Sequence, residues 1–266
     1  MKKKLMIVLV GLGALASASA QHYSAIHTSP APLVLKAQGS FYLGGERESQ
    51  TKAELGGICP PGHVTVNQMY VRYIIPQERT DNTSFVLIHG MHLSGKCWET
   101  TPDGRMGWDE YLVRKGHAVY VVDQVGIGRS GFNQKIYNGV RVGTVGPMNQ
   151  TPFSRKTDEN SWTNFRFGTK DGKPVQEAQF PVSRLEEFSK QNIPHIMRLP
   201  LPDANYRCLS ELSAEVKDVV LVSHSQSGAF PLETALHSRE GIRGMVLLEP
   251  GGTGLSLIHI SEPTRH

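Results

Sequence analysis

The sequence predicts an α/β fold, with a mainly parallel sheet flanked by helices. Short apolar runs rich in β-branched residues recur along the chain, as in strands buried on both faces. Stretches of helical character separate these runs, which is the order expected of βαβ units. The chain has 266 residues, 39% of them hydrophobic, and is long enough for one large domain of this kind.

The strands and helices can be placed in chain order. The alternation of apolar and polar residues at 63–75 predicts a long strand, and 39–43 is a candidate edge strand. A helix is predicted at 108–115, with Gly116 as its C-terminal cap. Another helix ends at Lys217. Continuous apolar runs predict four buried strands, at 85–88, 118–122, 219–222 and 245–248.

The segment 132–204 interrupts this alternation of strands and helices. It contains several aromatic residues and a helical pattern at 182–191. Ligand sites of α/β sheets lie at the carboxyl ends of the strands. We therefore expect this cap-like insertion to cover that edge of the sheet.

Residues 1–20 have the pattern of a secretory signal peptide. Lys2, Lys3 and Lys4 precede an apolar run at 5–16, and an Ala-x-Ala site ends at Ala20. The run is shorter than the ~20 residues that span a membrane. The pattern predicts a secreted or periplasmic protein with no membrane attachment after cleavage; an uncleaved N-terminal anchor is the alternative.

Charge and cysteine content disfavour two other classes of protein. Three of the four net positive charges come from the lysines of the signal peptide, so the basic composition gives little support to a nucleic-acid-binding protein. The three cysteines are too few for a disulfide scaffold and allow at most one intrachain pair, which the sequence does not identify.

The C-terminal residues 254–266 resemble the translation of a sequencing adapter. The matching string runs from Leu255 to Arg265. A genuine strand at 255–260 followed by a turn is the alternative. With the adapter interpretation, the α/β domain comprises residues 21–253, including the insertion at 132–204, and is truncated at its C-terminus.

The hexapeptide Ser-His-Ser-Gln-Ser-Gly directly follows the predicted strand 219–222. This arrangement is typical of a nucleophile elbow, in which a serine lies on a sharp turn between a strand and a helix. We predict Ser225 as the nucleophile, because the positions two before and two after it, Ser223 and Ser227, are small. Ser227 as nucleophile and a purely structural turn capped by Ser223 are the alternatives.

Two backbone N–H groups are predicted to form an oxyanion hole. One belongs to Met91, in the loop after the strand 85–88, and the other to Gln226, directly after the nucleophile. Such donors stabilise the tetrahedral intermediate of acyl transfer. In the same loop, His89 is interpreted as a satisfied structural histidine, and His92 is a candidate for substrate contact.

Glu249 is the predicted catalytic acid. It directly follows the strand 245–248 and lies 24 residues after Ser225, which leaves room for one helix and one strand. A carboxylate there can orient and stabilise a catalytic imidazole. The alternative is an acid at the end of a strand that faces water.

The glycines between Asp123 and Gly131 match a dinucleotide-binding pattern only nominally. They do not lie in the first βα unit, and no acidic residue follows at the end of the next strand. We therefore predict neither a cofactor nor a metal ion.

With these motifs, the sequence resembles a family of secreted bacterial esterases with the α/β-hydrolase fold. The resemblance covers residues 68–252 and is most specific in the tryptophan-bounded string 98–111 and in the hexapeptide 223–228. It implies a Ser-Glu-His triad that matches Ser225 and Glu249, with an oxyanion hole at Met91 and Gln226. Some members have cysteines directly after the His-Gly pair, where this chain has Met91 and His92.

The histidine of such a triad is not found in the sequence. His224 directly precedes the predicted nucleophile, His237 lies on the helix that follows, and His259 lies in the adapter-like tail. We expect the histidine to be absent from this chain, which would then hydrolyse activated esters feebly at most.

The predicted function is that of a serine hydrolase cleaving small-molecule carboxylic esters. A lactonase or amidase with the same residues is one alternative, and a non-catalytic binding protein with a hydrolase-like fold is another. A nucleotide-dependent oxidoreductase is disfavoured by the elbow and by the incomplete glycine pattern.

Overall fold

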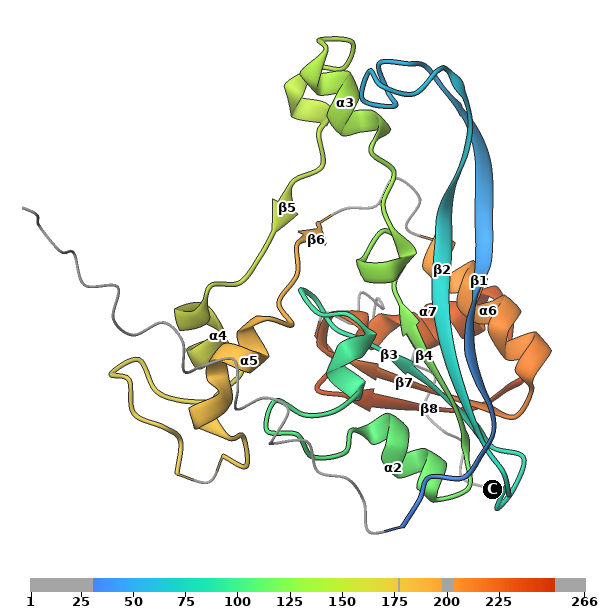
Figure 1. Cartoon of the computed structure of the whole chain (residues 1–266), viewed down its shortest axis with the longest axis vertical. Coiled ribbons are helices and arrows are strands. Elements are labelled where there is room, and N and C mark those ends of the chain that lie inside the picture. The colour runs from blue at the N-terminus through green and yellow to red at the C-terminus, as the bar shows by residue number, and fades with distance from the viewer. Residues whose placement is uncertain (1–30, 177, 198–202, 252–266) are drawn as a thin grey trace, which may run out of the picture.

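The computed structural model describes residues 31–176, 178–197 and 203–251. The strands of its main sheet are β1 (Leu35–Gln50), β2 (Gly62–Pro76), β3 (Ser84–Ile88), β4 (Ala118–Asp123), β7 (Val219–His224) and β8 (Ile242–Leu248). They lie in the order β1-β2-β4-β3-β7-β8 (Figure 1). The last four strands of this order run parallel, whereas β1 and β2 are antiparallel to their neighbours. This confirms the predicted α/β class and the mainly parallel sheet.

The central strands are buried on both faces. Side chains alternate between the two faces of a strand. In β3, Val86 and Ile88 therefore pack into one core cluster with α6 (Ala204–Val216) and α7 (Phe230–His237), while Leu87 packs into a second cluster with α2 (Trp108–Arg114). Burial on both faces explains why these strands are continuous apolar runs.

The edge strand β1 is longer than the sequence predicts. It pairs with β2 from Leu35 opposite Pro76 to Gln50 opposite Gly62, well beyond the predicted segment 39–43. Its residues alternate between more exposed and more buried positions, as expected for an edge strand with one covered face. The extra length comes from backbone hydrogen bonding with β2. The pattern of apolar residues in β1 does not show this pairing.

Helix α2 ends as predicted. Lys115 is its C-cap, and Gly116 follows with φ of +83°. A Cβ atom at Gly116 would approach Thr80 Oγ1 to 2.3 Å, so both the dihedral angle and the close contact favour glycine.

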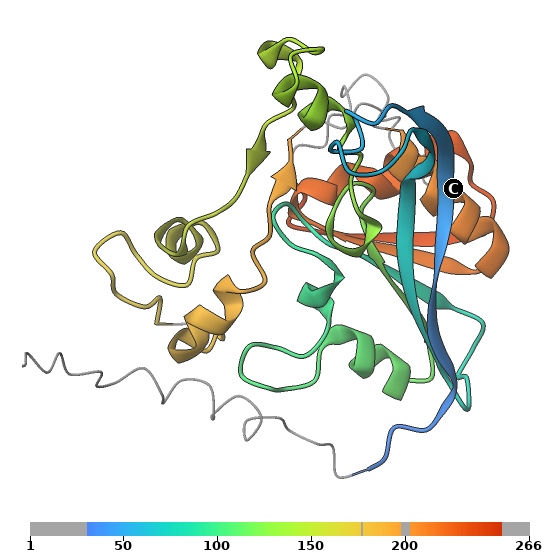
Figure 2. The same ribbon diagram turned by 45° about the horizontal axis from the view of Figure 1, so that its top comes forward.

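Between β4 and α6 the chain leaves the main sheet. The elements of this segment are η2 (Gly128–Ser130), α3 (Lys135–Arg141), η3 (Pro147–Asn149), β5 (Phe153–Ser154), α4 (Asp158–Asn164), η4 (Val182–Arg184), α5 (Leu185–Ser189) and β6 (His195–Ile196). Strands β5 and β6 pair with each other. Figures 1 and 2 show α4 and α5 on the side where β7 and β8 end. The helical pattern predicted at 182–191 corresponds to η4 and α5.

Some predictions fall outside the described residues. The predicted signal peptide (1–20) and adapter-like tail (254–266) both do, and the proposed domain limits remain predictions. Within the described ranges, no helix is long and apolar enough to cross a membrane. Cys59, Cys97 and Cys208 form no disulfide bond in this structure.

Candidate active site

The elbow after β7 has the strained backbone that the sequence predicts. Ser225 has φ of +55°, in the left-handed region that residues with a Cβ atom rarely adopt. It opens η5 (Ser225–Ala229), which leads directly into α7. The turn is packed tightly, because a Cβ atom at Gly228 would approach Pro250 Cβ to 2.5 Å. Strain of this kind is characteristic of functional sites.

Ser227 has a structural place in this turn. It is fully buried, its hydroxyl donates to His224 O at 3.0 Å, and the hydroxyl oxygen accepts from His224 N–H at 3.2 Å. The His224 side chain in turn accepts from the backbone N–H of Ser227. These contacts engage the His224 ring within the turn, and they make Ser225, at the sharp bend, the more accessible of the two serines.

The loop after β3 lies directly against the elbow. β3 and β7 are parallel neighbours, and Ile88 lies opposite Ser223, so the residues after both strands meet at one edge of the sheet. A Cβ atom at Gly90 would come within 3.2 Å of Ser225 Cβ. Among the described residues, neither the Met91 nor the Gln226 backbone N–H has a hydrogen-bond acceptor. The oxyanion hole at these two N–H groups remains a prediction, and no described acceptor occupies either group.

Glu249 lies where the sequence predicts, directly after β8. Gly251, two residues further on, donates its N–H to Ser225 O at 2.7 Å and so ties this segment to the elbow. The Glu249 side chain is 72% exposed and forms an ion pair with Arg166 Nη1 at 3.2 Å. The ion pair connects Glu249 to the insertion, which contains Arg166. The exposure of the side chain matches the alternative interpretation, an acid that faces water.

Comparison with known proteins places the chain in a family. No protein-family model matches the chain. A solved structure titled as a novel bacterial esterase is 41% identical to the chain, with a TM-score of 0.79, and the match covers 84% of this chain and 71% of that one. The chain belongs to this bacterial esterase family.

A curated relative is more distant. The protein named Probable secreted lipase phiG, from a fungal species, is 28% identical over 218 residues, which is 80% of this chain. The chain spans about half (52%) of the length of that relative. A peroxisomal α/β-hydrolase from Saccharomyces cerevisiae is 12% identical over 81% of this chain and 45% of its own, but the TM-score of 0.37 supports no inference.

In this esterase-family protein, His89 is a structural residue, as predicted. It is fully buried, and its Nε2 accepts the backbone N–H of Gln124 at 3.0 Å. Nδ1 therefore carries the proton and donates to Gly90 O at 2.8 Å. Burial lowers the pKa of His89 and favours this neutral form. Gln124 extends the network to Gln226, with Nε2 donating to Gln226 Oε1 at 3.2 Å.

The glycine-containing segment after β4 is held by hydrogen bonds to the carboxylate of Asp123. Asp123 is fully buried and accepts hydrogen bonds from Gly95 N–H at 2.7 Å and from the Arg129 backbone and guanidinium at 2.8 Å. Burial acts to raise the pKa of Asp123, but the hydrogen bonds from Arg129 and Gly95 outweigh it and keep the pKa below its ordinary value. These hydrogen bonds hold the segment after β4 as a turn.

Replacing Asp123 by alanine is expected to destabilise the esterase-family fold by roughly 3–5 kcal/mol, because Arg129 and the Gly95 N–H lose their buried partner. Asp103→Ala is the matched control, because it breaks a surface pair with Arg105 and should cost about 1 kcal/mol or less. Urea denaturation of both variants measures the difference. Equal losses would contradict the structural importance assigned to Asp123.

Two histidines that face each other connect the site to the insertion. His92 is buried with φ of +66°, and its Nε2 lies 2.6 Å from Ser154 Oγ in β5. Its ring centroid is 5.8 Å from that of His195 in β6. His92 therefore holds the β5–β6 pair against the loop after β3. Sequence reasoning missed His195, because no local pattern marks a histidine in a two-residue strand.

His195 makes the fold sensitive to acid. Burial lowers its pKa to about 4, and the nearby His89 and His92 act in the same direction. In the unfolded chain, His195 binds a proton below about pH 6.5. In the folded protein it does so only below about pH 4. The stability from this group is present above pH 6.5 and is lost as the pH falls through this window.

We expect His195→Asn to flatten the pH dependence of stability. Between pH 7 and pH 4 the wild type should lose roughly 3 kcal/mol more free energy of unfolding than the variant. Urea denaturation at intervals of one pH unit measures both curves. If the two proteins lose stability equally, His195 is not the group that carries this proton linkage.

A cavity of about 410 Å³ opens beside the elbow. Gln226 lines it from the elbow, His195 from β6, and Phe230 from the start of α7. This volume lies within the range of small-molecule binding sites, roughly 300–1,000 Å³. The cavity therefore provides space for a ligand next to Gln226.

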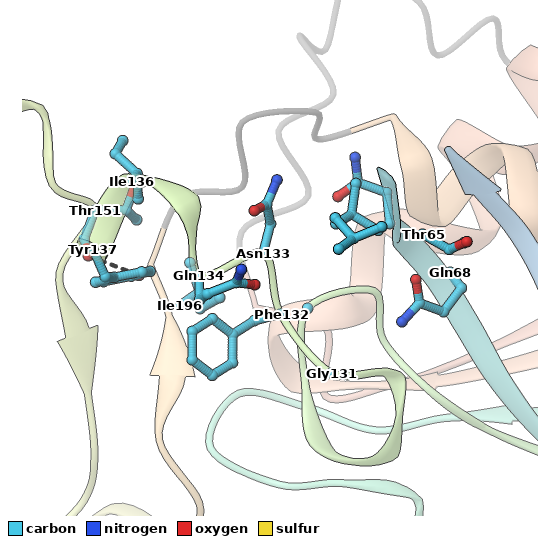
Figure 3. A pocket seen from close by; sticks show the side chains of 14 residues that line it. Thr65, Gln68, Gly131, Phe132, Asn133, Gln134, Ile136, Tyr137, Thr151 and Ile196 are labelled. Carbon is cyan, nitrogen blue, oxygen red and sulfur yellow. Dashed lines mark hydrogen bonds between the residues drawn. The ribbon is translucent and has the colours of Figure 1, made fainter. Parts of the chain in front are cut away.

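Another pocket is too small for this purpose. It lies between β2 and the segment that contains α3, with Thr65 and Gln68 on one side and Phe132 and Tyr137 on the other (Figure 3). Its volume is about 80 Å³, below the usual range for ligands.

Proposed function

We propose that the whole protein is a secreted serine esterase that cleaves carboxylic esters through an acyl-enzyme on Ser225. The observation that carries this proposal is the strained Ser225 beside the N–H groups of Met91 and Gln226, which have no acceptor among the described residues. A serine held in a left-handed turn at the end of a central strand is exposed to a substrate that lies over this edge of the sheet.

The mechanism follows from these positions. Ser225 Oγ attacks the ester carbonyl carbon, and the Met91 and Gln226 N–H groups stabilise the resulting oxyanion, each contributing about 3–4 kcal/mol. The alcohol leaves with a proton, and water then hydrolyses the acyl-enzyme to release the carboxylic acid. Glu249 orients the histidine that carries the proton in a triad of this type.

Two further observations support export and the substrate class. The signal-peptide pattern at 1–20 favours a secreted or periplasmic protein. One similar protein is named an esterase and another a secreted lipase, and both names denote enzymes that hydrolyse esters. The proposed partner is accordingly a small-molecule ester, with no cofactor or metal ion in the reaction.

Active-site labelling tests this function. A fluorophosphonate probe should label the full-length gene product, and Ser225→Ala should abolish the labelling. Ser227→Ala is the matched control, because it removes another hydroxyl of the elbow and should leave the probe attached to Ser225. Labelling that persists in Ser225→Ala would defeat the assignment, and a protein that is never labelled would favour a non-catalytic binding protein.

A further inference from the structure

The cavity beside the elbow is placed on one side of the nucleophile. Its walls come from the residues after β4 and from α6, α7 and β6. In the sheet, β4 and β8 lie on opposite sides of the pair β3 and β7. Glu249, which follows β8, therefore lies on the other side of Ser225 from the cavity.

We propose that this cavity binds the acyl group of the ester, and that it selects uncharged, apolar acyl chains of medium length. The inference rests on the proposed function and assigns its substrate class. The leaving alcohol must receive a proton from the imidazole that Glu249 orients, so the alcohol lies toward β8. The acyl group stays bonded to Ser225 and extends the other way, toward β4 and the cavity.

The walls of the cavity are suited to an apolar acyl chain. Six lining side chains are aliphatic or aromatic, namely Val125, Ile127, Ile196, Met197, Tyr206 and Phe230. Among the described residues, none that lines the cavity is an acid, a lysine or an arginine. His195 is neutral at pH 7, because burial lowers its pKa to about 4. A charged acyl group would find no countercharge on these described residues and would enter at a large desolvation cost.

A series of p-nitrophenyl esters from acetate to decanoate tests the proposal on the full-length gene product. Because each buried methylene adds binding free energy, kcat/KM should rise about fourfold per methylene until the cavity is full. A succinate monoester, which carries a charge on the acyl side, should be a poor substrate. A second series varies the alcohol with the acyl group held constant, and should show a weaker dependence on size.

Two variants change the size of the cavity in opposite directions. Met197 lines the cavity and is 45% exposed, so Met197→Trp narrows the cavity without opening the core. It should lower the ratio of octanoate to acetate kcat/KM about tenfold or more. Tyr206→Ala enlarges the cavity from α6 and should shift the optimum to longer acyl chains.

The matched control is Met148→Trp. Met148 is 96% exposed, also lies in the insertion, and does not line the cavity. This control should leave both series unchanged. The proposal is overturned if Met197→Trp leaves the acyl preference unchanged, or if it alters the alcohol preference instead. Hydrolysis that does not depend on Ser225 would instead refute the proposed function itself.

Discussion

Replacing Ser225 by alanine is expected to lower kcat for ester hydrolysis about 10⁶-fold in the full-length gene product. The variant removes the only group that forms the covalent intermediate, while the N–H groups of Met91 and Gln226 remain to polarise the carbonyl. Steady-state kinetics with an activated ester measure the loss. Retention of more than about 1% of the wild-type activity would contradict the assignment, because non-nucleophilic residual catalysis is far weaker.

The same position allows a second measurement, of stability. Ser225 has φ of +55°, and alanine keeps the Cβ atom that makes this dihedral angle costly. Ser225→Gly removes it, so we expect the glycine variant to be about 1 kcal/mol more stable than the alanine variant. Both are expected to be inactive. Equal stabilities would mean that the elbow carries no backbone strain.

Replacing Glu249 by glutamine is expected to lower kcat about 10³- to 10⁴-fold. Glutamine keeps the shape of the side chain but removes the charge that stabilises an imidazolium and orients the ring. Ser225 should still react with a fluorophosphonate, at a reduced rate. Single-turnover kinetics on the full-length gene product measure the effect on the chemical step.

Arg166→Ala provides the contrast for this prediction. Arg166 and Glu249 form a solvent-exposed ion pair, with side chains 77% and 72% exposed. Exposed ion pairs contribute little free energy. We expect a loss of activity of less than tenfold. If the two variants lose activity equally, the role of Glu249 is to hold the insertion, and it is not the catalytic acid.

The candidate site was predictable where it depends on short-range sequence. The elbow follows a strand directly, so the apolar run 219–222 and the small residues around Ser225 were enough to locate it. The same holds for Glu249, which follows β8, and for the loop that contains Gly90. Parallel strands end at one edge of the sheet, so their order brings these residues together.

Other features could not be predicted because they depend on distant partners. Gln124 links His89 to Gln226 across more than a hundred residues of sequence. His195 meets His92 only because β6 pairs with β5. The full length of β1 likewise follows from its ladder with β2. None of these contacts has a local spacing that a single sequence displays.

The sequence by itself determined the fold class, the strand-turn-helix around Ser225 and the positions of Met91, Gln226 and Glu249 in the chain. Periodicity and turn residues carry this information because local sterics and burial impose it on consecutive residues. Only the tertiary structure decided the ion pair of Glu249 with Arg166, the buried state of His195 and the cavity beside Gln226. Each of these arises from side chains that are far apart in the sequence and are brought together by packing of the insertion on the sheet edge.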